Sequence, residues 1–218
     1  MTSLRTTSQA AFWNARYGWG GEEPERYAFG SAPDPFIAEA LLDLEQSGAL
    51  GHSATVVDLG GGEGRHGVFA AHRGHHVRVV DFAETGLVVA DRLAAEAGVP
   101  LEAEAADLTT WQPDRAYNLA VLGFVHLLPA ERQQLLARLP TILRPGGWLV
   151  ARWFTPAHAE RGTFGPSARD RLVSADLLRT ELKGGQWHRC NERTVVLDSG
   201  RYLRGAADVL DVVWQAPG

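Results

Sequence analysis

Residues 54–67 read Ala-Thr-Val-Val-Asp-Leu-Gly-Gly-Gly-Glu-Gly-Arg-His-Gly, and this stretch decides the fold. Its apolar, β-branched beginning at residues 54–58 predicts a buried strand. The glycines at residues 60–64 predict a tight turn, and residues 65–73 are expected to form a helix after it. A strand that leaves through a glycine turn into a helix begins a βαβ unit, which predicts a parallel sheet with a ligand-binding loop.

The same alternation of short apolar runs and helical stretches continues along the chain. The predicted strands cover residues 54–58, 76–80, 101–104, 117–123, 148–154, 186–197 and 208–215. One predicted helix begins at Asp34-Pro35, and the others cover residues 65–73, 84–97, 129–143 and 174–182. Because the first five strands alternate with helices, they are expected to be parallel, whereas the last two are expected to pair antiparallel at the sheet edge. The pattern predicts an α/β, Rossmann-like, doubly wound fold.

The chain has 218 residues, of which 45% are apolar, and this suits one hydrophobic core. We therefore expect a single domain. Residues 1–50 are expected to form an amino-terminal cap and helix, and residues 51–154 the cofactor-binding core. Residues 155–218 are expected to supply a substrate-side loop, a helix and the closing strands.

The balance of 26 acidic against 21 basic residues gives a formal charge of -5 without a one-signed block. This argues against a nucleic-acid partner and favours a small-molecule substrate. The apolar runs are shorter than the roughly 20 residues that cross a membrane, so no membrane association is expected. The start of the chain lacks a signal peptide, and the single cysteine, Cys190, has no partner for an internal disulfide. These features predict a cytoplasmic protein and leave its oligomeric state open.

The glycine loop also contains a match to the dinucleotide pattern G-x-G-x-x-G at residues 62–67. The first glycine of that pattern should open the turn, but Gly60 holds this place, and counting from Gly60 puts Arg65 at the third glycine position. The carboxylates of Asp58 and Glu63 would repel a pyrophosphate, whereas S-adenosylmethionine carries an ammonium and a sulfonium. We therefore predict this cofactor, with S-adenosylhomocysteine as product. The predicted loop contacts are Asp58, Gly60, Gly61 and Gly62.

Two more acidic residues follow predicted strands. Asp81 lies about 20 residues after the loop, the spacing at which a carboxylate reaches the ribose hydroxyls of an adenine cofactor. An alternative role for Asp81 is to cap the next helix. Asp107 follows the third strand and is expected to accept from the adenine amino group, while the backbone amide of Leu108 serves a ring nitrogen. Phe82 and Phe124, beside the strand ends, complete the predicted cofactor contacts.

In order and spacing, these motifs resemble those of the class I S-adenosylmethionine-dependent methyltransferases. The residues that carry this resemblance are 58–65, 80–81, 106–108 and 143–147. Within the class, residues 12–17, 29–33, 154–156 and 162–166 are similar to the tellurite-resistance TehB-like branch. The resemblance implies a seven-stranded, mostly parallel sheet with an antiparallel last strand. It also implies further cofactor contacts from Trp13, Arg16 and Tyr17.

Methyl transfer from a sulfonium has an activated leaving group, so the protein mainly aligns the nucleophile, excludes water and, where needed, removes a proton. His126, just beyond the fourth predicted strand, is the first candidate for a general base. Its alternative role is a hydrogen bond to a neighbouring loop or to the cofactor. Arg152 and His158, at and after the fifth strand, are predicted to bind an anionic substrate.

Two further groups of side chains bear on the predicted site. The aromatic side chains of the amino-terminal region are candidates for a lid over the sulfonium or for ordinary packing: Trp13, Tyr17, Trp19 and Phe29. No metal is expected, because the clustered histidines lack a carboxylate or cysteine partner at useful spacing and are expected to form a solvated loop: His72, His75 and His76.

The sequence thus predicts methyl transfer to a small acceptor such as a thiol or a metalloid oxyanion. A non-catalytic protein that binds S-adenosylmethionine is the alternative, and a nucleotide-dependent oxidoreductase is a more distant one.

Overall fold

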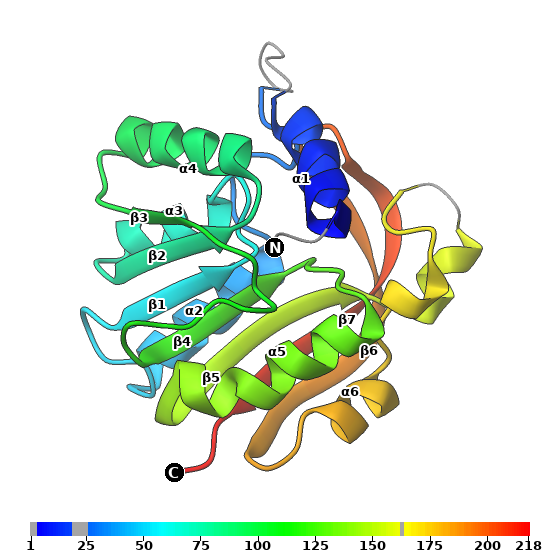
Figure 1. Cartoon of the computed structure of the whole chain (residues 1–218). Coiled ribbons are helices and arrows are strands. Elements are labelled where there is room, and N and C mark those ends of the chain that lie inside the picture. The colour runs from blue at the N-terminus through cyan, green and yellow to red at the C-terminus, as the bar shows by residue number, and fades with distance from the viewer. Residues whose placement is uncertain (1–3, 19–25, 162–163) are drawn as a thin grey trace.

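The structure is a computed structural model that describes residues 4–18, 26–161 and 164–218, and within these ranges seven strands form one sheet (Figure 1). The strands are β1 (Thr55–Leu59), β2 (His76–Asp81), β3 (Glu102–Ala105), β4 (Tyr117–Gly123), β5 (Leu143–Phe154), β6 (Gln186–Ser199) and β7 (Leu203–Gln215). Their order is β3-β2-β1-β4-β5-β7-β6. The first five pair in parallel, and β7 is antiparallel to both β5 and β6. The predicted mostly parallel sheet with a reversed last strand is confirmed.

Helices cover both faces of this sheet (Figure 1). They are α1 (Leu4–Tyr17), α2 (Pro35–Gln46), α3 (Arg65–His72), α4 (Glu84–Ala97), α5 (Pro129–Ile142) and α6 (Ala175–Glu181), with short 3-10 turns η1 (Pro156–Glu160) and η2 (Arg169–Arg171). Val56 and Val57 are neighbours on β1 but enter different cores, one with α2 and α3 and the other with α5 and α6. This alternation follows from the two-residue period of a strand buried on both faces. No helix in the described ranges has the length and apolar character that a membrane span requires.

One predicted boundary is wrong. The fifth strand is predicted to begin at residue 148, but β5 begins at Leu143, which already pairs with Tyr117. The pairing register shifts between Tyr117 and Leu119, and Gly146 adopts a φ of 71°. A proline and two glycines indicate a turn in the sequence, but here they form an irregularity within the strand, as β-bulges do.

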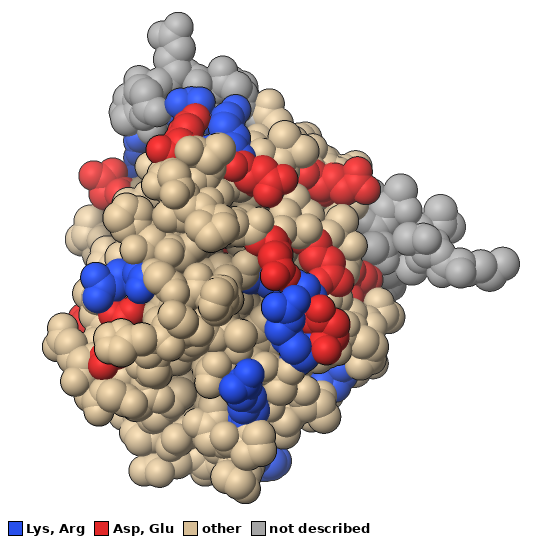
Figure 2. All heavy atoms as spheres, turned by 90° about the vertical axis from the view of Figure 1, so that its left-hand side faces the viewer, with Lys and Arg blue, Asp and Glu red and all other residues tan. Residues whose placement is uncertain are grey.

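The surface around the β3 edge carries both signs of charge side by side, as Figure 2 shows. At this edge, Arg78 on β2 donates to Glu102 on β3 at 2.9 Å and to Asp114 at 2.8 Å. Charged side chains along an exposed edge strand discourage pairing with another sheet.

A buried ion triad fixes α2 to the sheet. Arg152 on β5 donates to both carboxylate oxygens of Asp211 on β7, at 2.6 and 2.9 Å, and to Asp34 at 2.9 Å. The other oxygen of Asp34 accepts from the amides of Phe36 and Ile37, which makes Asp34 the predicted N-cap of α2. All three charged side chains are 2% exposed. Asp34 therefore starts the helix and ties it to the carboxyl-terminal end of β5.

Replacing Arg152 with methionine should destabilise the protein by about 3–5 kcal/mol, because it leaves the Asp34 carboxylate buried without its cation. The matched control is Arg169→Met, whose ion pair with Glu160 is exposed and should change stability by less than about 0.5 kcal/mol. Urea unfolding of the two variants measures the difference, and equal losses would show that the triad has no special role.

Candidate active site

The glycine loop between β1 and α3 has no room for side chains. A Cβ on Gly61 would lie 2.7 Å from the carboxylate of Asp58. Gly62 has a φ of +52°, and a Cβ there would collide with the hydroxyl of Tyr17. The loop is therefore held between Asp58 beneath it and Tyr17 above it, and close approach requires glycine at both positions.

Two buried carboxylates organise this loop. Asp81, at the end of β2, accepts from the amide of Gly62 at 2.9 Å and from the amide of Ala83 at 2.8 Å. Asp58 accepts from the amide of Gly67 at 3.0 Å, and its Oδ1 has no hydrogen-bond partner among the described residues. Burial raises the pKa of Asp58 to about 7 and that of Asp81 to about 6. A cation bound at the loop would offset the free energy that burial of these charges costs.

Asp81 lies between the glycine loop and α4. Its bond to the amide of Ala83 stabilises the turn before α4, which has no side-chain cap among the described residues, and its bond to Gly62 joins β2 to the glycine loop. Its location at the loop agrees with the predicted site, while its contact with a ribose remains a prediction.

Glu63 has a different role from the one that the sequence suggested. Its carboxylate is 3% exposed and accepts from the amides of Ala28 and Phe29, both at 2.9 Å. It anchors the segment before α2 and does not stand in the turn as a free charge. The electrostatic argument against a pyrophosphate therefore rests on Asp58 and Asp81.

An aromatic cluster from α1 covers the loop. Tyr17 is 8% exposed and stacks on Trp13 with ring centroids 5.7 Å apart, and Phe29 packs edge-on against Tyr17 at 5.9 Å. Burial, followed by the charge of Asp81, raises the pKa of Tyr17 well above its usual value. Figure 1 shows α1 between α4 and the β6–β7 hairpin. Tyr17 and Trp13 are thus brought to the loop, while Trp19 lies outside the described residues.

Arg16 lies at the edge of this cluster. Its guanidinium carbon lies 4.5 Å from the ring centroids of both Phe12 and Tyr202 and 5.8 Å from that of Trp13. In this arrangement Arg16 joins α1 to the β6–β7 hairpin through cation-π contacts. Its contact with the cofactor remains a prediction.

The predicted adenine side of the site is partly buried. Oδ1 of Asp107 accepts from the amide and the hydroxyl of Thr109, at 2.8 and 2.7 Å, so it stabilises the turn after β3. Leu108 is 3% exposed, and a Cβ on Gly60 would lie 3.5 Å from its side chain. Phe82 packs beside the Tyr17 cluster. These residues adjoin the loop, and their contacts with an adenine remain predictions.

The exit of β4 carries backbone strain and a histidine. Phe124 adopts a φ of 60°, uncommon for a residue with a side chain, and its amide donates to the carbonyl of Arg152 at 2.8 Å. His126 stacks on Phe154 at 5.3 Å, and its Nδ1 lies 3.3 Å from the carbonyl of Arg171. Because a carbonyl only accepts, Nδ1 carries the proton and Nε2 holds the lone pair.

The free nitrogen of His126 is buried. Nε2 has no hydrogen-bond partner among the described residues. Burial, the largest cause, lowers the pKa of His126 to about 4, so the ring is neutral at pH 7. The structure thus shows the loop hydrogen bond expected of His126, while its role as a general base remains a prediction.

Two predicted substrate-binding residues have structural roles instead. Arg152 belongs to the buried triad, where carboxylates occupy Nε and both terminal nitrogens. His158 is 2% exposed; its Nε2 lies 2.9 Å from the carbonyl of Phe164, and its Nδ1 accepts from the amide of Asp208 at 3.4 Å. The prediction of anion binding by these two side chains is wrong for this structure, because each already has its partners within the fold.

The histidine cluster also differs from its prediction. His75 is buried, its Nε2 lies 2.8 Å from Glu45, and its Nδ1 accepts from the amide of Ala54 at 3.2 Å. It joins α2 to the start of β1 and is not part of a solvated loop. The carboxylate partner was missed because it lies 30 residues away in the sequence.

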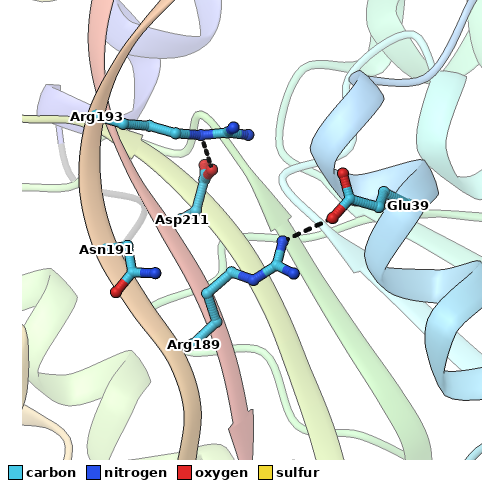
Figure 3. Close-up of a pocket in the computed structure, with 5 residues that line it drawn as sticks. All are labelled: Glu39, Arg189, Asn191, Arg193 and Asp211. Atoms are coloured by element: carbon cyan, nitrogen blue, oxygen red, sulfur yellow. Dashed lines mark hydrogen bonds and ion pairs between the residues drawn. The ribbon is translucent and has the colours of Figure 1, made fainter.

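Two pockets lie near the arginines of β5 and β6. The one in Figure 3, of about 290 Å³, is lined by residues of α2, β6 and β7: Glu39, Arg189, Asn191, Arg193 and Asp211. Its charges are paired, with Arg189 at 2.9 Å from Glu39 and Arg193 at 2.6 Å from Asp211. The second, of about 400 Å³, reaches Arg65 at the start of α3. Arg65 is not among the predicted site residues, although its place directly after the glycine loop is a signal of a role in the site.

Gly62→Ala should lower stability by roughly 1–3 kcal/mol more than Gly98→Ala. Both glycines have positive φ, but a Cβ at Gly62 collides with Tyr17, whereas nothing lies within 4 Å at Gly98. Urea unfolding measures both losses. Adding Tyr17→Ala should remove the excess in a double-mutant cycle, and an additive cycle would contradict the placement of Tyr17 over the loop.

A family model and a curated relative each match part of the chain. Residues 56–147 match a family model described as a methyltransferase domain. Hemagglutinin 1 of Eikenella corrodens is 29% identical over 94 residues, which cover 42% of this chain and only 31% of that protein.

Solved structures share the fold over most of the chain. The N-methyltransferase NodS from Bradyrhizobium japonicum WM9, solved with S-adenosyl-L-homocysteine, has 16% identity and a TM-score of 0.65, covering 98% of this chain and 99% of NodS. TehB from Haemophilus influenzae has 14% identity and a TM-score of 0.64, covering 80% of this chain and 61% of the TehB chain. A protein that converts a disulfide bond into a thioacetal group during echinomycin biosynthesis has 18% identity and a TM-score of 0.66, covering 85% and 82%. The class I methyltransferase fold that the motifs predicted is confirmed, and the methyltransferase domain model spans residues 56–147 of it.

Proposed function

From this class I methyltransferase domain, we propose that the protein transfers a methyl group from S-adenosylmethionine to a small-molecule acceptor. The observation that carries the proposal is the arrangement of Asp81: its carboxylate joins the end of β2 to the amide of Gly62. In doubly wound sheets, ligands bind at the carboxyl ends of the strands where the strand order reverses. The order here reverses between β1 and β4, next to this loop.

The residues around the loop fit a cationic adenosine cofactor. Asp58 has a buried oxygen without a partner among the described residues, and burial raises the pKa of both Asp58 and Asp81. Gly61 and Gly62 bring the backbone close to any ligand, and Tyr17 covers the loop with its ring. When bound, the cofactor supplies a methyl group already activated on a sulfonium. Asp81, Gly62 and Tyr17 are the residues that would hold it.

His126 is the proposed proton acceptor. Its Nδ1–H is held by the carbonyl of Arg171, which aims the lone pair of Nε2 away from that loop. A neutral imidazole accepts a proton from an acceptor nucleophile as the nucleophile attacks. The stack on Phe154 fixes the ring plane, because the two planes differ by only 10°. His126 therefore orients the acceptor and takes up its proton. The imidazole is already neutral before this transfer.

A small acceptor is proposed because the sheet and its helices account for nearly all of the described chain. A cytoplasmic location and the absence of a nucleic-acid partner are part of the proposal, and their support is the single cysteine and the mixed charge of the chain. Transfer of labelled methyl groups to a panel of thiols, amines, phenols and metalloid oxyanions tests the proposal. Transfer to one class supports it, whereas cofactor binding without transfer to any would favour the non-catalytic alternative.

His126→Gln should lower kcat about 10²–10⁴-fold with the acceptor found in that panel, because glutamine cannot take up a proton. Since the pKa of His126 is lowered to about 4, wild-type activity that depends on its neutral form should be constant from about pH 6 to 8 and fall as the pH approaches 4. Steady-state kinetics against pH measures both. His52→Gln, at an exposed position, is the control, and an unchanged kcat in His126→Gln would remove the base from the mechanism.

A further inference from the structure

Arg65 is a buried cation without a counter-ion. The residue is 6% exposed, and its Nη1 donates to the carbonyl of Phe29 at 2.7 Å and to the hydroxyl of Ser199 at 2.8 Å. Both acceptors are neutral. Within the described ranges, no carboxylate lies within ion-pair distance of Arg65, and no hydrogen bond uses its Nε or Nη2. Burial lowers the pKa of its guanidinium, against the opposing effect of the more distant carboxylates of Asp34, Asp58 and Glu63.

The second pocket, of about 400 Å³, gives this guanidinium an opening. It lies between the start of α2, the β6–β7 hairpin and Arg65. Its volume falls within the range of pockets that hold small ligands. Much of its wall is apolar: Pro33, Pro35, Phe36, Val195, Val196 and Leu203. A ligand there meets mainly hydrophobic surface and one uncompensated cation.

The other buried charges that line this pocket are neutralised within the fold, and the exposed carboxylate of Asp198 at its edge lies 4.0 Å from Arg204. Arg152 pairs with Asp34 and Asp211, and Arg193 pairs with Asp211 at 2.6 Å. Glu39 pairs with Arg189 at 2.9 Å. The electrostatic preference of the pocket therefore comes from Arg65.

The pocket adjoins the proposed reaction centre. Arg65 directly follows the glycine loop, and its guanidinium carbon lies 5.9 Å from the ring centroid of Phe124 at the exit of β4. Arg152, which lines the pocket, accepts from the amide of Phe124 through its carbonyl. A molecule held at Arg65 thus lies beside the segment that carries His126.

We propose that this pocket is the acceptor site and that Arg65 binds a carboxylate on an acceptor with an apolar body, an inference that rests on the proposed methyltransferase function. The free edge of the guanidinium, Nε and Nη2, matches the two oxygens of a carboxylate. One cation among apolar walls suits a single negative charge better than a doubly charged phosphate.

Calorimetry with 2-naphthylacetate and its neutral amide, 2-naphthylacetamide, tests the proposal in the presence of S-adenosylhomocysteine. The wild-type protein should bind the acid at least about tenfold more tightly than the amide, as expected for a hydrogen-bonded charge pair. Arg65→Gln should abolish this preference and leave binding of S-adenosylhomocysteine unchanged. Arg169→Gln, which removes an exposed paired arginine outside the pocket lining, should change neither.

A second variant separates binding from folding. Val196 lines the pocket and is 79% exposed, so Val196→Glu adds a negative charge without disturbing the core. It should weaken binding of the acid several-fold and leave binding of the amide unaffected.

Equal binding of acid and amide by the wild-type protein, or no binding of either, overturns the proposal. Loss of S-adenosylhomocysteine binding in Arg65→Gln would also overturn it, by assigning Arg65 to the cofactor. Failure of the wild-type protein to bind S-adenosylhomocysteine would instead overturn the proposed function.

Discussion

The carboxylate of Asp81 is the point on which the site depends. It is 5% exposed and receives two backbone amides, one from Gly62 in the loop and one from Ala83 before α4. A buried carboxylate is costly unless it is hydrogen-bonded, so these contacts hold the loop and the start of α4 in fixed positions. The loop in turn fixes where Tyr17 rests. The aspartate at the end of β2 thus helps to position the glycine loop, the start of α4 and, through Tyr17, the helix α1.

The amino-terminal cap is tied down by polar contacts as well as by aromatic packing. Glu63 accepts from the amides of Ala28 and Phe29, and Arg65 donates to the carbonyl of Phe29. Both charged residues flank Gly64, so the end of the glycine loop is hydrogen-bonded to the segment that precedes α2. The hydroxyl of Ser199 on β6 donates to the same carbonyl at 2.6 Å. The cofactor loop, the cap and the β6–β7 hairpin therefore meet at Phe29, and a ligand at the loop can influence all three.

Much of the fold was predictable because its signals are local. The glycine loop, the proline after Asp34 and the alternation of strands and helices each follow from a few neighbouring residues, and the structure places them as expected. The roles of Arg152 and His158 were not predictable in this way. Arg152 forms ion pairs with Asp34 and Asp211, which lie 118 and 59 residues away in the sequence, and a single sequence does not reveal such pairings. For the same reason, Arg65 looked like an ordinary first residue of a helix until its neighbours were known.

The central claim is that the Asp81-linked glycine loop binds S-adenosylmethionine. The most direct measurement is calorimetric titration of the wild-type protein and of Asp81→Asn with S-adenosylhomocysteine and, separately, with NAD. We expect the wild-type protein to bind S-adenosylhomocysteine but not NAD, and Asp81→Asn to weaken this binding at least about tenfold, as for other hydrogen bonds to charged groups. Binding of NAD without S-adenosylhomocysteine, or an Asp81→Asn protein with undiminished affinity, would contradict the claim.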